Sequence, residues 1–280
     1  MTGEEIGAER RPRGIPLRTL VPNAITALAL CSGLFGIRYG IVGDWDKAAW
    51  AIVLAAFLDM MDGRIARLMK GQSRFGAELD SLSDVTAFGV APAIILYQWM
   101  LAQLDPASPG HELWARYGWL VALAHAVCGA LRLARFNANI DAEDQPHKSA
   151  GFLTGIPAPA GAGLALLPVF LWLWTGAEIF HEPLLVAPWA ALVAFLMVSN
   201  LATFSWGSLR LRSHVRFGAI VVIALIGAAL LSAPWETLGV TALLYATSIP
   251  FSIAAYGRVK KQRRAAAERV RTPPMGEALP

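Results

Sequence analysis

The sequence predicts an all-α polytopic membrane protein with about eight transmembrane helices. Hydrophobic residues make up 56% of the 280 residues, charged residues only 16%, and the mean hydropathy is +0.49. A soluble domain of this length carries about a quarter charged residues. Apolar stretches of about 20 residues, the length at which an α-helix spans a bilayer, recur along the whole chain.

Eight apolar segments are expected to form these helices. In chain order they cover residues 21–41, 48–69, 82–103, 116–136, 157–178, 184–204, 217–234 and 238–256. Polar, basic tails are predicted at residues 1–18 and 258–280. Cys31 and Cys128 both fall within apolar segments, so they are expected to be small hydrophobic side chains and not a disulfide or a metal pair.

The basic residues predict the orientation in the membrane. If the eight segments alternate across the bilayer, 21 of the 24 Lys and Arg residues lie on one side, and Arg38, Lys47 and Arg116 lie on the other. By the positive-inside rule, both termini and the turn at residues 64–74 face the cytoplasm. This arrangement explains the pI near 9.3 without a nucleic-acid partner.

Four aspartates flank the turn between the second and third segments. Asp59 and Asp62 are three residues apart, and Asp80 and Asp84 are four apart, so each pair lies on one face of a helix. Acidic groups at membrane depth are costly and usually mark a functional site. Because all the ligand atoms are oxygen, the cluster is predicted to hold one or two divalent cations such as Mg²⁺ or Mn²⁺. The alternative is a solvated turn at the membrane interface.

Small residues and one arginine accompany the aspartates. Gly63 and Gly76 permit close backbone approach, and Ala66 leaves the same helix face open. Arg67 is a candidate phosphate ligand. The combination predicts a site for a phosphate-bearing substrate beside the metal.

Two further features predict anion binding at the same membrane face. Arg132 and Arg135 lie three residues apart in the fourth segment, and the planar guanidinium suits phosphate or carboxylate oxygens. The stretch from Gly155 to Gly161 contains two prolines and opens the fifth segment, where a helix N-terminus is available to an anion. His125 lies seven residues before Arg132, but a buried core histidine is the favoured interpretation.

The spacing D-x2-D-G-x2-A-R-x8-G-x3-D-x3-D, from Asp59 to Asp84, resembles the signature of the CDP-alcohol phosphatidyltransferase family at every fixed position. Several other stretches are similar to the phosphatidylserine synthase branch of that family. They are Val21–Thr26, Phe75–Asp84, Ala87–Pro92, Cys128–Asn137 and Gly155–Pro159.

The resemblance implies a reaction and roles for the site residues. A serine hydroxyl would attack the β-phosphorus of CDP-diacylglycerol, giving phosphatidylserine and CMP. Asp59, Asp62 and Asp80 would bind Mg²⁺ or Mn²⁺, and Asp84 would share a metal and accept the hydroxyl proton. The CDP pocket would be lined by Asn23, Gly63, Ala66, Arg67 and Gly76. Arg132 and Arg135 are candidates for the lipid phosphate or the serine carboxylate.

The resemblance also implies an architecture: a six-helix core at residues 19–205 in a homodimer, with the site open to the cytoplasmic leaflet of a bacterial inner membrane. Two additional helices at residues 206–257 follow this core, and their role does not follow from the sequence. Two other functions stay open. One is a sibling enzyme that uses glycerol 3-phosphate or inositol phosphate as acceptor, and the other is a membrane transporter.

Overall fold

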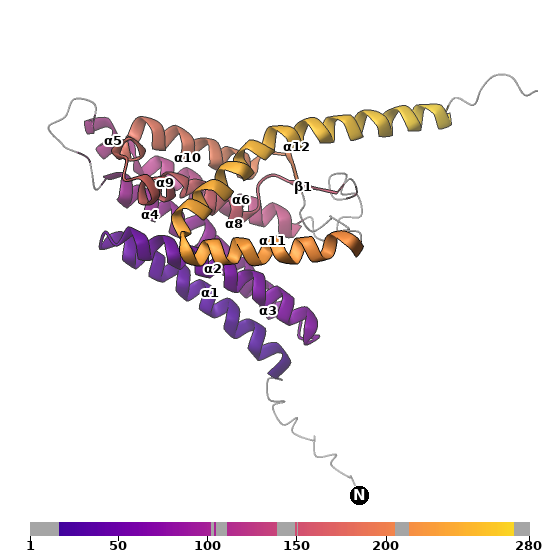
Figure 1. Cartoon of the computed structure of the whole chain (residues 1–280), viewed down its shortest axis with the longest axis horizontal. Helices are drawn as coiled ribbons and strands as arrows, with labels where there is room; N and C mark the ends of the chain where they lie inside the picture. The colour runs from indigo at the N-terminus through magenta and orange to yellow at the C-terminus, as the bar shows by residue number, and fades with distance from the viewer. Residues whose placement is uncertain are drawn as a thin grey trace, which may run out of the picture.

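The computed structural model of the chain describes residues 17–101, 104, 111–138, 149, 151–204 and 213–271. These residues form a bundle of α-helices with one short two-stranded sheet (Figure 1). Most of the predicted tail at residues 1–18 and the last nine residues of the tail at 258–280 lie outside the described residues. The prediction of a mainly helical protein is confirmed.

The first two helices form an antiparallel pair (Figure 1). α1 (Leu17–Ile41) and α2 (Trp45–Leu68) are joined by a tight turn in which Gly43 has a φ of +77°. Asp44 caps α2, because its carboxylate accepts hydrogen bonds from the Lys47 backbone N–H at 3.2 Å and from its Nζ at 2.6 Å. These bonds lower the pKa of the Asp44 carboxyl, which keeps the cap ionised.

The third predicted segment is a longer helix than hydropathy indicates. α3 (Arg74–Asp84), the π-helix η1 (Val85–Val90) and α4 (Ala91–Leu101) follow one another without a break. The helix begins at Arg74 and not near residue 82, because the Ser73 side chain caps it by accepting the Gly76 N–H at 3.0 Å. Hydropathy does not detect this start, since the first two turns are polar.

The next segments are interrupted helices. α5 (His111–Tyr117) precedes α6 (Trp119–Ala138), and α8 (Ala158–Ala165) precedes α9 (Leu167–Thr175). The axes of α8 and α9 differ by 44°. Pro168 explains this bend, because proline lacks a backbone N–H and its ring clashes with the carbonyl one turn earlier.

A small sheet, which the sequence did not predict, joins two distant segments. β1 (Phe152–Thr154) pairs antiparallel with β2 (Ala202–Phe204). After η2 (Glu178–His181), α10 (Pro183–Val198) ends at Val198, and Ser199 adopts an extended conformation. The predicted helix at residues 184–204 was therefore too long, because its last three residues form β2. The sheet holds the start of the α8 segment against the end of α10.

Two further helices end the described part of the chain. α11 (Ser213–Ser232) is followed by α12 (Pro234–Arg271), which packs against α8, α9 and β2. At about 1.5 Å per residue, the 38 residues of α12 are longer than the hydrocarbon core of a bilayer. Its C-terminal part extends well beyond the other helices (Figure 1).

The helices agree with a membrane protein, and the predicted number of eight spans is not confirmed. Four of the described helices are long and apolar enough to cross a membrane, or five if the bent pair of α8 and α9 is one span. α10 has 16 residues, which is shorter than a transmembrane helix. α2 is long enough, but it carries Asp59, Asp62 and Arg64 within its second half. Each of the eight predicted segments nevertheless contains a helix.

Close packing of α1 against η1 sets the position of the first three helices. A Cβ atom at Gly33 would lie 2.8 Å from the Ala87 Cα and 2.9 Å from its Cβ, so only glycine allows this contact. Ala87 is fully buried within the main hydrophobic cluster. The backbones of α1 and η1 therefore lie as close together as helices in membranes often do at small residues.

This contact predicts that Gly33→Ala destabilises the protein. The added methyl group overpacks against backbone atoms, a change that costs about 1–3 kcal/mol. Thermal unfolding in detergent measures the effect as a lower Tm. Gly227→Ala on α11 is the matched control, since nothing lies within 4 Å of its Cβ position. Equal Tm values for the two variants would contradict the packing argument.

Candidate active site

The structure brings the predicted acidic residues together between α2 and α3. Asp59, Asp62 and Asp80 each offer a carboxylate oxygen, and these oxygens all lie within 4.8 Å of one another. Asp84 lies within hydrogen-bonding distance of Asp59. Asp62 is buried, and the other three are half-buried. The two helical pairs therefore face each other.

The turn between α2 and α3 makes this approach possible. α2 ends in a Schellman motif, in which the Gly71 N–H donates to Ala66 O at 2.9 Å and the Lys70 N–H donates to Arg67 O at 3.3 Å. Lys70 occupies the left-handed position of the motif, with a φ of +50°. A Cβ atom at Gly71 would overlap the Arg18 carbonyl group of α1, so glycine is required there. The turn is thus fixed against the start of the first helix.

α1 closes the site with two polar side chains. The Thr26 hydroxyl lies 2.5 Å from Asp62 Oδ2 and holds this carboxylate in place. Asn23, one helical turn earlier, lies beside Gly76, where a Cβ atom would come within 2.7 Å of its Oδ1. Asn23 was predicted from resemblance, whereas Thr26 was not identified as a site residue. Its spacing of three residues from Asn23 on one helix face was the signal that could have revealed it.

The other predicted pocket residues line the same end of α2. Among the described residues, and apart from the backbone of α2 itself, nothing lies within 4 Å of the position where a Cβ would stand at Gly63, so this face of α2 is open. Ala66 is half-buried and Arg67 is exposed. α2 therefore has an open face of small residues next to the acidic cluster, and the exposed Arg67 lies at the edge of this face.

The two predicted arginines of α6 have different surroundings. Arg135 donates hydrogen bonds to Asn200 Oδ1 at 2.8 Å and to the Ser199 carbonyl at 3.1 Å, so it ties α6 to the end of α10. Arg132 is half-buried and interacts electrostatically with Asp84. Its Nε atom is buried and has no hydrogen-bond partner among the described residues. Arg132 is therefore the one that belongs to the acidic site.

The charge balance of the site favours a bound cation. The four carboxylates repel one another, Arg132 offsets only part of their charge, and a half-buried location strengthens the repulsion. An oxygen-only donor set of this kind fits a hard divalent ion and does not fit zinc or copper. The residues present could thus hold a divalent metal, with Asp59, Asp62 and Asp80 as the central ligands.

Comparison with known proteins agrees with this geometry. The family model for CDP-alcohol phosphatidyltransferase matches residues 19–206, and that for CDP-alcohol phosphatidyltransferase 2 matches residues 214–250. The chain belongs to the CDP-alcohol phosphatidyltransferase family. The first match covers all four aspartates and both arginines of the site, and the second covers α11 and the first part of α12.

Relatives in this family carry the name CDP-diacylglycerol–serine O-phosphatidyltransferase. The protein from Mycobacterium tuberculosis is 36% identical over 248 residues, which are 89% of this chain and 82% of the relative. The protein from Helicobacter pylori is 40% identical over 152 residues, covering 54% and 58% of the two chains. That from Bacillus subtilis is 31% identical over 182 residues, covering 65% and 88%.

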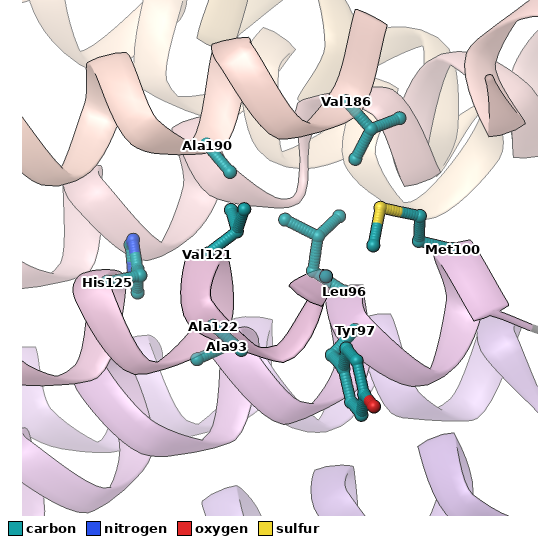
Figure 2. Close-up of a pocket in the computed structure, with 10 residues that line it drawn as sticks. Ala93, Leu96, Tyr97, Met100, Val121, Ala122, His125, Val186 and Ala190 are labelled. Carbon is teal, nitrogen blue, oxygen red and sulfur yellow. The ribbon is translucent and has the colours of Figure 1, made fainter. Parts of the chain in front are cut away.

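His125 is a core residue, as the sequence indicated. It is 1% exposed, and its ring lies next to the backbone of Phe88. Figure 2 shows it at the edge of a small pocket between α4, α6 and α10, where the other labelled side chains are apolar apart from the Tyr97 hydroxyl. The pocket has a volume of about 10 Å³, which is room for about one water molecule. It is not a substrate site.

The hydrogen bond from Thr26 to Asp62 predicts that Thr26→Val weakens metal binding. Groups that orient a metal ligand typically contribute about 10–100-fold to affinity. We expect the Kd for Mn²⁺ to rise by about tenfold, measured by the electron paramagnetic resonance signal of free Mn²⁺ in a detergent titration. Thr247→Val is the control, since this exposed hydroxyl donates only within its own helix. An unchanged Kd in Thr26→Val would remove Thr26 from the metal site.

Proposed function

We propose that the protein transfers a phosphatidyl group from CDP-diacylglycerol to the hydroxyl of L-serine, giving phosphatidylserine and CMP. The observation that carries the proposal is the convergence of four aspartates at the positions of the family signature. The printed names of relatives that match most of this chain support serine as the acceptor.

Asp59, Asp62, Asp80 and Asp84 would hold Mg²⁺ or Mn²⁺. When bound, the metal would neutralise charge on the diphosphate and on the departing CMP. This assignment rests on the oxygen-only donor set and on the distance of at most 4.8 Å between the three central carboxylates. The hydrogen bond from the Thr26 hydroxyl would keep the Asp62 carboxylate oriented toward the metal.

Asp84 is proposed to accept the proton of the serine hydroxyl. It interacts with Asp59 of the acidic cluster and, more weakly, with Arg132 of α6. The serine oxygen forms a bond to the β-phosphorus of CDP-diacylglycerol, and the bond from this phosphorus to the CMP oxygen breaks. The hydroxyl proton moves to an oxygen of Asp84, and the electron pair of the broken bond leaves with CMP.

The nucleotide end of CDP-diacylglycerol would bind the open face of α2. Gly63 and Ala66 leave room for the cytidine diphosphate, and Arg67 pairs with a phosphate. Gly76 and Asn23, which lie in contact distance of each other, complete the pocket from α3 and α1. Because these residues come from three helices, the pocket depends on the packing of α1.

Arg132 is proposed as the ligand of an anionic substrate group. Its guanidinium interacts electrostatically with Asp84, the proposed base, and its Nε lacks a partner among the described residues. Arg135, with hydrogen bonds to Asn200 and Ser199, is proposed to support this wall of the site from behind.

The proposed architecture is a six-helix core at residues 19–205, two added helices at 206–257 and basic tails at either end. All eight helical segments would cross or enter a bacterial inner membrane, with both termini and the site on the cytoplasmic side. The excess of Lys and Arg on that side supports the orientation. We propose a homodimer from the family resemblance.

The decisive experiment is CMP release from CDP-diacylglycerol by the purified protein in detergent. L-Serine, glycerol 3-phosphate and inositol phosphate are compared as acceptors, each with Mg²⁺ and with Mn²⁺. Release with serine alone, abolished by a chelator, is the expected result. Release with another acceptor instead would retain the family but refute the choice of serine. Absence of release with every acceptor would refute the proposed activity.

Asp84→Asn is expected to lower kcat by at least about 100-fold, since the amide cannot accept the hydroxyl proton. Binding of CDP-diacylglycerol and the Tm should change little, because the amide has the same shape. Asp46→Asn, an exposed acid in the first turn of α2, is the control and should retain wild-type turnover. Wild-type rates in Asp84→Asn would exclude it as the base.

Arg132→Gln is expected to raise the KM for serine by at least about tenfold, because a charged hydrogen bond to the carboxylate is lost. The KM values for serine and for CDP-diacylglycerol are measured separately. An increase only in the KM for CDP-diacylglycerol would assign Arg132 to the lipid phosphate. Unchanged values for both substrates would remove it from substrate binding.

A further inference from the structure

A groove of about 560 Å³ lies between α1, α2 and α11. Most of its lining is apolar or aromatic, from the side chains of Phe35, Tyr39, Trp50, Leu54, Phe57 and Leu230. Ser32 also lines it, but its hydroxyl is already used, because it donates to the Ala51 carbonyl at 2.8 Å. The groove therefore suits an occupant that is apolar along most of its length.

α11 covers one side of this groove without closing it. Figure 1 shows α11 beside α1 and α2, and Leu230 is its lining residue. Leu230 is half-buried, whereas every residue from Val221 to Ala229 is exposed. Among the described residues, and apart from α11 itself, nothing lies within 4 Å of a Cβ placed at Gly227, three residues before Leu230. Protein side chains of the described chain therefore leave space between α11 and the first two helices.

The groove has the depth of one membrane leaflet. Tyr39 and Lys47 line it on either side of the α1–α2 turn, and this turn lies at the opposite end of α2 from the acidic cluster. From Lys47 to Phe57, α2 rises by about 15 Å at about 1.5 Å per residue. This length is about half of the hydrocarbon core, which is about 30 Å thick. The groove thus runs from the membrane interface at the α1–α2 turn to about the middle of the bilayer.

Two cations lie at the mouth of the groove. Arg38 Cζ and Lys47 Nζ each lie 5.7 Å from the centroid of the Tyr39 ring. Lys47 pairs with Asp44 at 2.6 Å, but its side chain is 60% exposed and an ammonium group has three donors. Arg38 is exposed and has no ion pair within the described part of the chain, and Asp46, the other acid of this turn, is also exposed. The mouth therefore keeps donors for one phosphate group.

We propose that this groove binds a membrane phospholipid, with one acyl chain along the apolar lining and the phosphate on Arg38 and Lys47. Phosphate oxygens accept charge-assisted hydrogen bonds from both groups. The lipid belongs to the leaflet at the α1–α2 turn and fills the space under α11. It is distinct from CDP-diacylglycerol, whose proposed site lies at the other end of α2, so the proposal does not depend on the reaction.

The test is a titration of the protein in dodecyl maltoside with phosphatidylglycerol, followed by native mass spectrometry. EDTA is present, so that no metal draws the lipid phosphate to the acidic cluster. Phosphatidylglycerol should bind more tightly than diacylglycerol, which lacks the phosphate. The double variant Arg38→Gln, Lys47→Gln should raise the Kd for phosphatidylglycerol by at least about tenfold. Arg116→Gln is the matched control, since Arg116 lies 5.5 Å from the Tyr117 ring centroid and does not line the groove.

A second pair of variants tests the apolar part of the groove. Leu54→Trp adds a large ring inside the groove from a side chain that is 50% exposed, so the fold should tolerate it. We expect this variant also to raise the Kd for phosphatidylglycerol by at least about tenfold. Leu34→Trp is the control, because Leu34 is 49% exposed on α1 and does not line the groove.

The outcomes decide the proposal directly. A wild-type Kd in the double variant or in Leu54→Trp would overturn it. Equal losses of affinity in Arg116→Gln or Leu34→Trp would also overturn it, because lipid would then bind the apolar surface in general. If Leu54→Trp changed the oligomeric state, measured by light scattering, and left the Kd unchanged, a second copy of the chain and not a lipid would occupy the groove.

Discussion

Repulsion among four carboxylates is the constraint on which the rest of the structure depends. Asp59, Asp62, Asp80 and Asp84 are held on two facing helices, half-buried or buried, where like charges interact more strongly than in water. Such a cluster is stable only when bound cations or protons neutralise part of its charge. The Thr26 hydroxyl donates a hydrogen bond to Asp62, and Arg132 supplies a positive charge that interacts with Asp84. Both interactions offset part of the negative charge.

Close contacts at three glycines fix the positions of the helices around the acidic cluster. Gly33 lets α1 approach η1, Gly71 lets the α2–α3 turn lie against the start of α1, and Gly76 lies against Asn23. At Gly33 and Gly71 a larger side chain would collide with backbone atoms, and at Gly76 it would collide with the Asn23 side chain. The first helix, which carries none of the aspartates, is thereby fixed over them, and its side chains reach both the metal ligands and the proposed nucleotide pocket.

The far wall of the site depends on segments that are distant in sequence. Arg135 ties α6 to the end of α10, and the small sheet ties β1 to β2. α12 packs on the same sheet and on α8.

The sequence by itself determined the fold class and the acidic site. Long apolar segments leave helices as the way to satisfy backbone hydrogen bonds in a membrane, and spacings of three and four residues place Asp59 with Asp62, and Asp80 with Asp84, on single faces. Local periodicity cannot say which faces meet. Only the tertiary structure decided that Thr26 contacts Asp62, that Arg132 interacts with Asp84, and that Arg135 instead binds Asn200. These are long-range contacts between helices, and side-chain packing sets them.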